Sequence, residues 1–289
     1  MSSHVIDLLR APTADEQAAA QQYVDSAIAE CVHVPGLVAS PRSVRQVGVV
    51  GSGTMGGGIA MAFANAGFDV VLLDSQAEAL ERGLSRVRDN YAFSVKRGKL
   101  TQADVDARLT RIRGVLQYEA LAEADLIIEA VFEELAIKQE VFRQLDRVAK
   151  PGAILATNTS GLDINEISSV TQRPQDVVGA HFFSPAHVQK LLEVVQARHT
   201  APDVIATLMS LGNPLRKHAI LSQVYPGFIG NALFRQYIRE AHFLIEEGAL
   251  PHEVDSVLEQ FGYAMGVFRV HDMAGNDVGW TMRKAQIAT

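Results

Sequence analysis

The sequence predicts an α/β protein in which a doubly wound, mostly parallel sheet is followed by a small all-helical domain. Short apolar, β-branched runs recur along most of the chain, and helical segments separate them, which indicates parallel strands joined by helical crossovers. After about Gln223 the pattern changes to apolar residues at helical spacing. We therefore expect an N-terminal helix and linker over 1–43, a sheet domain over 44–223 and a helical domain over 224–289.

Composition narrows the class of protein. The chain has 289 residues, 48% of them hydrophobic and 20% charged, which suits a globular protein with a sizeable core. The net charge of −7 argues against nucleic acid as the main partner. No apolar run approaches the roughly 18 residues of a membrane span. The only cysteine, Cys31, allows no intrachain disulfide, and we see no secretory signal, so we expect a cytoplasmic protein.

The first 43 residues look like an appendage to the sheet domain. The run Thr13-Ala14-Asp15-Glu16 has the pattern of a capping box and predicts a helix that continues to about Cys31. The apolar face of this helix is thin, with Tyr23 and Val24 on it, so we expect it to dock on another part of the protein. Pro35-Gly36 then indicates a linker.

The expected elements alternate between strand and helix. Strands are predicted over 47–50, 70–73, 126–131, 153–157, 177–180 and 191–195. Helices are predicted over 57–67, 75–97, 101–112, 135–148, 228–247, 251–261 and 272–286. In a doubly wound sheet, ligands bind beyond the carboxyl ends of the strands, so the residues that follow these strands are the candidates for chemistry.

A glycine motif follows the first strand and identifies a dinucleotide site. Gly51, Gly53 and Gly56 form G-x-G-x-x-G, in which they allow a tight turn, a close approach of the backbone to a pyrophosphate and close packing of the next helix. Asp74 closes the second strand, where a carboxylate accepts hydrogen bonds from the ribose hydroxyls of NAD and repels the 2′-phosphate of NADP. The sequence therefore predicts a Rossmann-like, NAD-binding domain over 44–223.

A charged residue inside a buried strand points to the catalytic group. Glu193 interrupts the apolar run 191–195, and a buried carboxylate is costly unless it is paired. The nearest candidate partner is His181, at the end of the preceding strand. A carboxylate beside an imidazole fixes its tautomer and raises its basicity, as a dehydrogenase needs to take a proton from an alcohol. By pattern alone, an edge-strand glutamate and a structural histidine explain the two residues equally well.

These motifs together resemble the L-3-hydroxyacyl-CoA dehydrogenase family. The matching stretches are 51–56, 128–133, 158–160, 181–185, 227–231 and 264–268, in an order and spacing that agree over 44–283. The dehydrogenase segment of multifunctional fatty-acid β-oxidation proteins is the most similar. There it is paired with an enoyl-CoA hydratase and follows a linker much like 34–37. The resemblance implies NAD-dependent oxidation of L-3-hydroxyacyl-CoA to 3-ketoacyl-CoA, without a metal ion.

The resemblance also assigns roles to single residues. It implies that His181 is the catalytic base and Glu193 its partner, and that Ser160 and Asn231 hold the substrate oxygen and the nicotinamide region. The residues that it places around NAD are Gly51, Gly53, Thr54, Met55, Gly56, Asp74, Glu133, Lys138 and Ser160.

A CoA-binding helix is implied over 75–99. Asn90 stands there in place of a common serine, and Lys96 or Arg97 would meet CoA phosphates. An ordinary solvated helix end, favoured by the helix dipole, explains these two cations equally well.

Two departures from the family pattern concern the helical domain. Family members continue past Gly279-Trp280 with a further segment, whereas this chain stops at Thr289, so we expect an incomplete domain. Gly230-Asn231-Ala232 replaces the usual Gly-Asn-Arg. We expect the exposed apolar face of helix 228–247 to be covered in a homodimer or by the helix over 14–31.

Three alternatives remain open. The chain could act with a hydratase partner, it could be an impaired NAD-binding fragment that acts as a partner or sensor, or it could be a dehydrogenase of a free hydroxy acid.

Overall fold

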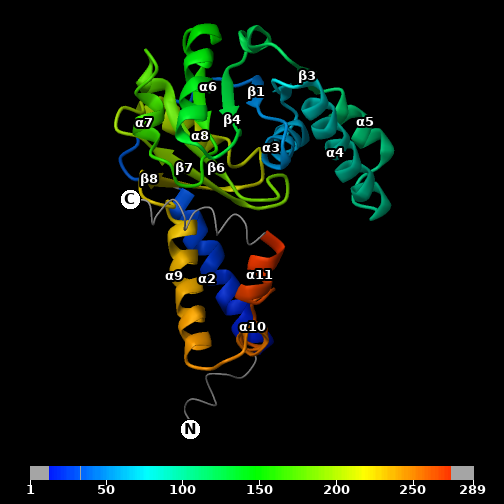
Figure 1. Cartoon of the computed structure of the whole chain (residues 1–289), viewed down its shortest axis with the longest axis vertical. Coiled ribbons are helices and arrows are strands. Elements are labelled where there is room, and N and C mark those ends of the chain that lie inside the picture. Colours follow the sequence, from blue (N-terminus) through cyan, green and yellow to red (C-terminus); the bar gives the residue numbers. More distant parts are fainter. Residues whose placement is uncertain (1–12, 33, 275–289) are drawn as a thin grey trace. The chain divides into compact units, whose positions relative to one another are not determined.

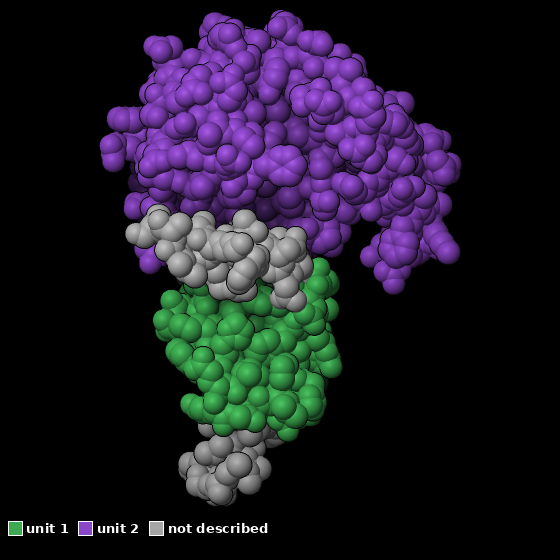
Figure 2. Space-filling model, viewed as in Figure 1, with its two compact units in different colours: residues 1–27, 230–289 green, residues 28–229 purple. Residues whose placement is uncertain are grey.

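The computed structural model describes residues 13–32 and 34–274, which form two compact units. One unit comprises residues 28–229, and the other comprises residues 1–27 and 230–289 (Figure 2). In the described residues no helix is long and apolar enough to cross a membrane.

The unit of residues 28–229 includes most of the segment that we expected to be a linker. Val34 and Leu37 pack against its apolar core, and the Arg42 guanidinium pairs with Asp176 at 2.7 Å and with Asp203 at 2.8 Å. These contacts explain why the linker belongs to the same compact unit as the sheet.

The larger unit is built on one eight-stranded sheet. Its strands are β1 (Gln46–Val50), β2 (Asp69–Leu73), β3 (Ile112–Val115), β4 (Leu126–Glu129), β5 (Ile154–Thr157), β6 (Val177–Phe182), β7 (Leu191–Gln196) and β8 (His218–Gln223). They lie in the order β3-β2-β1-β4-β5-β6-β7-β8, and all neighbours are parallel except β6 and β7. This order reverses direction between β1 and β4, which is the doubly wound arrangement that the sequence predicts.

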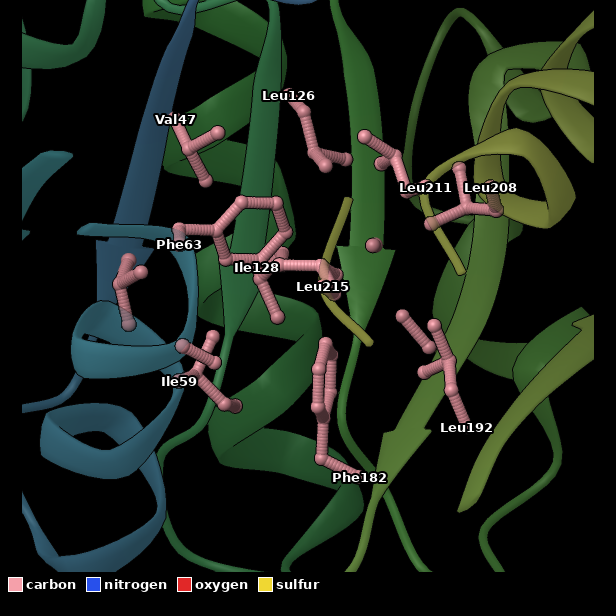
Figure 3. Close-up of a cluster of buried hydrophobic side chains, with 14 of the residues drawn as sticks. Val47, Ile59, Phe63, Leu126, Ile128, Phe182, Leu192, Leu208, Leu211 and Leu215 are labelled. Atoms are coloured by element: carbon pink, nitrogen blue, oxygen red, sulfur yellow. The ribbon is translucent and has the colours of Figure 1, made fainter. Parts of the chain in front are cut away.

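Helices cover both faces of the sheet (Figure 1). One face packs against α3 (Thr54–Asn65) and α8 (Pro202–Ser210), and the other packs against α6 (Leu135–Val148) and α7 (Ile164–Ser168). Figure 3 shows side chains of the first core, in which Phe63 and Ile59 lie near Ile128. Phe182 and Leu192 belong to the same core. Their chain neighbours His181 and Glu193 therefore project from the opposite face, since successive side chains of a strand alternate.

Most of the predicted helices are present, with shifts at their ends. The predicted helix over 135–148 is α6 with the same bounds, and the one over 75–97 is α4 (Ala77–Lys96). The predicted helix over 101–112 ends earlier, as α5 (Gln102–Leu109), because β3 begins at Ile112. Thr101 caps α5 by accepting from the Asp104 backbone, in the expected capping box. The sequence analysis did not find β3, β8, α7, α8 or the short 3₁₀ helices Tyr118–Leu121 and Pro174–Asp176.

The second unit is helical, as predicted. It contains α9 (Gly230–Glu246), α10 (Pro251–Phe261), α11 (Val267–Ala274) and most of α2 (Ala14–Val32). Its small core is centred on Ala241, Val254 and Val267. The buried carboxylate of Asp255 caps α11 by accepting from the backbone N–H groups of Phe268 and Arg269. Most of the helix expected over 272–286 lies outside the described residues.

The N-terminal helix has the predicted cap but little buried surface. Thr13 and Glu16 form the capping box, in which each side chain accepts from the other residue's backbone N–H. All residues over 14–26 are exposed, including Tyr23 and Val24. This stretch of α2 therefore leaves its thin apolar face uncovered.

Candidate active site

The glycine motif forms a tight turn between β1 and α3. Gly51 has a φ of +97°, and a Cβ there would lie 2.7 Å from the Ala130 carbonyl oxygen. A Cβ at Gly56 would lie only 1.7 Å from the carbonyl oxygen of Gly51, so no larger residue fits between helix and strand. A Cβ at Gly53, in contrast, would meet no atom within 4 Å, which leaves its backbone open to a ligand. These three environments fit a bound dinucleotide pyrophosphate at the start of α3.

Asp74, directly after β2, forms hydrogen bonds to the turn that carries the glycine motif. Its Oδ2 accepts from the backbone N–H of Ser52 at 2.9 Å and from the Ser52 hydroxyl at 2.6 Å. Burial alone would raise the pKa of the Asp74 carboxyl, but the hydrogen bonds from Ser52, Gln76 and Ser75 outweigh it and lower the pKa. The carboxylate is thus ionised at neutral pH, as the predicted contact with ribose hydroxyls requires. Ser52 is also tightly packed, because a Cβ at Gly83 of α4 would lie 2.3 Å from its carbonyl oxygen.

A buried ion pair lies at the carboxyl end of β4. Glu129 is fully buried, and its Oε1 accepts from Lys138 Nζ and from the Val131 backbone N–H, each at 2.7 Å. Its Oε2 accepts from the Thr157 hydroxyl at 2.7 Å, which ties β4 to β5. The sequence analysis placed Lys138 beside NAD. In the structure Lys138 is almost fully buried, and its ammonium lies 3.3 Å from Glu133.

Glu133 joins this ion pair to the segment that follows β5. Its Oε1 accepts from the Thr159 hydroxyl at 2.7 Å and from both the backbone N–H and the hydroxyl of Ser160, at 2.7 and 2.9 Å. Burial raises the pKa of the Glu133 carboxyl, but the Lys138 charge and these hydrogen bonds outweigh it and lower the pKa. Ser160 and Glu133, which were predicted separately, therefore form one connected cluster.

The expected contact between His181 and Glu193 is present. The two residues are direct cross-strand neighbours on β6 and the antiparallel β7. His181 Nδ1 lies 2.6 Å from Glu193 Oε2, and both side chains are buried. Glu193 Oε1 accepts from the Ile229 backbone N–H at 3.0 Å. The carboxylate thus fixes Nδ1 as the protonated ring nitrogen and leaves Nε2 as the one that can accept a proton.

Aromatic side chains and an amide fix the surroundings of the imidazole. The His181 ring centroid lies 4.4 Å from that of Phe183 and 5.7 Å from that of Phe228. Phe228 is buried and has a φ of +51°, an unusual conformation for a non-glycine residue. The Asn158 side chain accepts from the Phe182 backbone N–H at 2.8 Å and so links the ends of β5 and β6. The imidazole is therefore held on several sides.

The residues predicted to meet CoA lie along α4. Asn90 is partly buried and donates weakly to the Met61 sulfur at 3.7 Å. Lys96 and Arg97 at the end of the helix are exposed, and the Arg97 guanidinium lies 5.1 Å from the Phe93 ring centre. Both cations are therefore accessible to a ligand, whereas Asn90 is partly buried.

Three other predicted residues are placed as follows. Thr54 is exposed in the first turn of α3, where its hydroxyl lies 3.4 Å from Arg86, and Met55 is partly buried against the core. Asn231 lies in the first turn of α9, in the helical unit. The roles assigned to these residues stay predictions.

Sequence reasoning gave no role to Ser52, Glu129, Thr159 or Phe228. The argument that singled out Glu193, a charge within an apolar strand, applies equally to Glu129 at the end of the run Leu126–Glu129. Ser52 and Thr159 act through local hydrogen bonds that have no distinctive sequence pattern. Phe228 resembles any core aromatic until the fold places it beside His181.

A sheet of this order, with a dinucleotide turn at the start of α3, defines the class of dinucleotide-binding α/β proteins. Comparison with known families specifies it further. Residues 46–224 match the 3-hydroxyacyl-CoA dehydrogenase NAD binding domain, and residues 227–289 match the C-terminal domain of the same family. The chain belongs to the 3-hydroxyacyl-CoA dehydrogenase family, which confirms the predicted resemblance and NAD as the cofactor.

Individual relatives agree with this placement. A peroxisomal bifunctional enzyme of Danio rerio is 46% identical over 244 residues, which cover 84% of this chain and 33% of the relative. The chain thus spans about a third of the length of the curated relatives it matches. The structure of (S)-3-hydroxybutyryl-CoA dehydrogenase from Ralstonia eutropha is similar, with 35% identity, a TM-score of 0.78 and coverage of 81% of this chain and 84% of that one. The 3-hydroxybutyryl-CoA dehydrogenase of Escherichia coli K12 has 40% identity, a TM-score of 0.78, and 82% and 51% coverage.

Proposed function

We propose that this chain catalyses the NAD-dependent oxidation of an L-3-hydroxyacyl-CoA to the 3-ketoacyl-CoA in fatty-acid β-oxidation. The observation that carries the proposal is the buried His181–Glu193 pair, at the end of β6 in the same unit as the dinucleotide turn. His181 Nε2 takes the proton of the substrate hydroxyl, and Glu193 stabilises the imidazolium that forms. NAD, when bound, accepts the hydride that leaves the substrate carbon.

Other residues bind and orient in this proposal. Gly51, Gly53 and Gly56 hold the pyrophosphate at the start of α3, and Asp74 binds the ribose hydroxyls. Ser160 and Asn231 hold the substrate oxygen and the nicotinamide region. Glu133 contacts NAD in the family pattern, and its bonds to Ser160 support a further role in placing that hydroxyl. The burial of Lys138 between Glu129 and Glu133 supports an indirect role, in which it holds Glu133 in place.

The substrate assignment includes a site for the CoA moiety on α4. Lys96 and Arg97 are exposed at the helix end, where their positive charges would attract CoA phosphates. Arg97 lies over the exposed Phe93 ring, which supports a surface that can also receive a planar base. Replacing both cations by Gln should raise the KM for the CoA thioester and leave the affinity for NAD unchanged.

An absorbance assay for NADH tests the function directly. We expect turnover of L-3-hydroxybutyryl-CoA or of a long-chain 3-hydroxyacyl-CoA, and no saturation by free 3-hydroxybutyrate. Turnover of the free acid alone would replace the proposal by a hydroxy-acid dehydrogenase. Binding of NAD without turnover of either thioester would replace it by a catalytically impaired NAD-binding protein.

We propose that the helical unit pairs with a second copy of this chain. Among the described residues, the core of this unit holds three buried apolar side chains. Leu233 on α9 is 68% exposed, and the other exposed apolar side chains of the unit include Phe243, Leu244, Val257 and Phe261. Exposed apolar side chains on so small a unit favour an interface. Sedimentation of the full chain and of a version without residues 1–40 should show a dimer. An active monomer in both cases would contradict the pairing.

The compartment stays a prediction. The single cysteine led us to expect the cytoplasm, whereas the name of the Danio rerio relative places that protein in peroxisomes. Fluorescence microscopy of a tagged chain in its own cell would distinguish them.

A further inference from the structure

A buried lysine contacts the loop that follows the strand of His181. Lys217 precedes β8 and is only 7% exposed. Its ammonium donates to the carbonyl oxygens of Ala186 at 2.7 Å and Gln189 at 2.5 Å. Both carbonyls belong to the loop over 183–190, which joins β6 to β7 and thus connects the strand of His181 to the strand of Glu193.

This lysine is buried at a cost that no counter-ion offsets. In the part of the chain that the structure describes, Lys217 forms no ion pair, and its ammonium lies 5.5 Å from the centre of the Phe182 ring. Burial lowers the pKa of the Lys217 ammonium to about 8. The titratable group that faces it is His187, whose pKa burial and the Lys217 charge both lower. The groups that the ammonium binds are the two loop carbonyls.

The loop that Lys217 holds also packs against α3, the helix that begins at the dinucleotide turn. Within the loop, the carbonyl oxygen of Pro185 accepts from the backbone N–H groups of Val188 and Gln189, so the turn closes on itself. Ala186 is fully buried, and a Cβ at Gly58 of α3 would lie 3.2 Å from the Cβ of Ala186. The loop is therefore fixed on one side by α3 and on the other by Lys217.

We propose that Lys217 is a positioning residue for catalysis, which fixes the 183–190 loop through the carbonyls of Ala186 and Gln189 and thereby the orientation of the His181 imidazole. Only the activity part of this proposal rests on the proposed dehydrogenase function. A shift of a catalytic group by about 1 Å can lower a rate by about 10²-fold. Loss of the Lys217 ammonium leaves two carbonyls without their donor and lets the loop move, while the glycine turn that binds NAD is not touched.

The variant Lys217→Met tests this proposal, with Lys190→Met as the matched control because Lys190 is an exposed lysine of the same loop. In Lys217→Met we expect kcat to fall at least about tenfold. The KM for NAD should stay within about twofold, and the melting temperature should change little, because removal of a buried charge and loss of the donor to two carbonyls have opposite effects on stability. In Lys190→Met all three should match the wild type. A lysine with a merely structural role would lower the melting temperature and leave kcat unchanged.

Hydrogen exchange provides a readout that does not depend on activity. The backbone amides of Val188 and Gln189 should exchange at least about tenfold faster in Lys217→Met than in the wild type, with no change in β1. Lys217→Arg, which keeps a cation with N–H donors, should restore most of the protection and of kcat. Unchanged exchange and unchanged kcat in Lys217→Met would overturn the proposal. A wild-type chain without turnover would contradict the dehydrogenase function, whereas the exchange rates would still decide the role of Lys217.

Discussion

Glu129 and Glu193 are two buried carboxylates of one sheet that have different cationic partners. Glu129 binds the ammonium of Lys138, and Glu193 binds the imidazole of His181. A lysine ammonium stays charged at neutral pH, whereas histidine gains and loses its proton in that range. The first pair can therefore only hold structure, while the second can also transfer a proton. Burial and pairing alone do not identify a catalytic carboxylate. Its role depends on whether its partner can gain and lose a proton near neutral pH.

Replacing His181 by Gln should have the largest effect on activity. Gln keeps a polar side chain of similar reach but cannot act as a base at neutral pH. We expect kcat to fall by ~10²–10⁴, the usual contribution of a positioned general base. NAD affinity, measured by fluorescence titration, should remain that of the wild type. Unchanged turnover would show that both buried pairs are structural and that the proposed mechanism is wrong.

Replacing Glu193 by Gln should have the next largest effect. The amide can donate to Nδ1 of His181, which would move the ring proton to Nε2 and favour the tautomer that cannot accept the substrate proton. We expect kcat to fall by about 10- to 10²-fold, less than after loss of the base itself. The acid side of the pH–rate profile should also shift to lower pH, because the imidazolium loses its anionic partner. A profile that keeps its wild-type shape would argue against coupling of the two groups.

Replacing Asp74 by Asn extends the comparison to a carboxylate that has no cationic partner among the described residues. Asp74 is bound by neutral donors of Ser52, so the substitution removes charge without leaving a buried cation. We expect NAD affinity to fall about tenfold, because a charged hydrogen-bond acceptor becomes neutral. The difference in affinity between NAD and NADP should become smaller. Asp69→Asn is the matched control, since Asp69 begins the same strand and is exposed. NADP binding equal to NAD binding in the wild type would contradict the assignment.

The sequence was informative where chemistry or periodicity is local. The glycine motif, the helix over 135–148 and the pairing of Glu193 with His181 could all be predicted, because a short stretch carries each signal. The edge strand β8 (His218–Gln223) could not, since it mixes polar and apolar residues and lacks a buried run. Lys217 follows Arg216 and looks like part of a solvated basic pair. Its burial depends on the loop over 183–190, which only the fold brings to it.

Replacing Glu129 by Gln should have the smallest effect on kcat and a large effect on stability. The substitution leaves the Lys138 charge buried with Glu133 as its remaining anionic partner, at 3.3 Å. Breaking a buried ion pair on one side costs about 3–5 kcal/mol, which urea unfolding should show as a lower midpoint. The double variant Glu129→Gln, Lys138→Met also removes the buried cation and should recover part of this loss. The Glu133 carboxylate then loses its cationic neighbour, but it is partly exposed and keeps its hydrogen bonds from Thr159 and Ser160.

Kinetic measurements on these variants distinguish a carboxylate with a structural role from one that supports proton transfer. At a temperature where Glu129→Gln is still folded, we expect its kcat to stay above that of Glu193→Gln, and its pH–rate profile to keep the wild-type shape. Glu129 contacts Lys138, Thr157 and the Val131 backbone, and none of these groups is the proposed base. If Glu129→Gln instead lost turnover while its unfolding midpoint stayed unchanged, the two carboxylates would not differ as their partners imply. The β4 pair would then have to be counted with the catalytic residues.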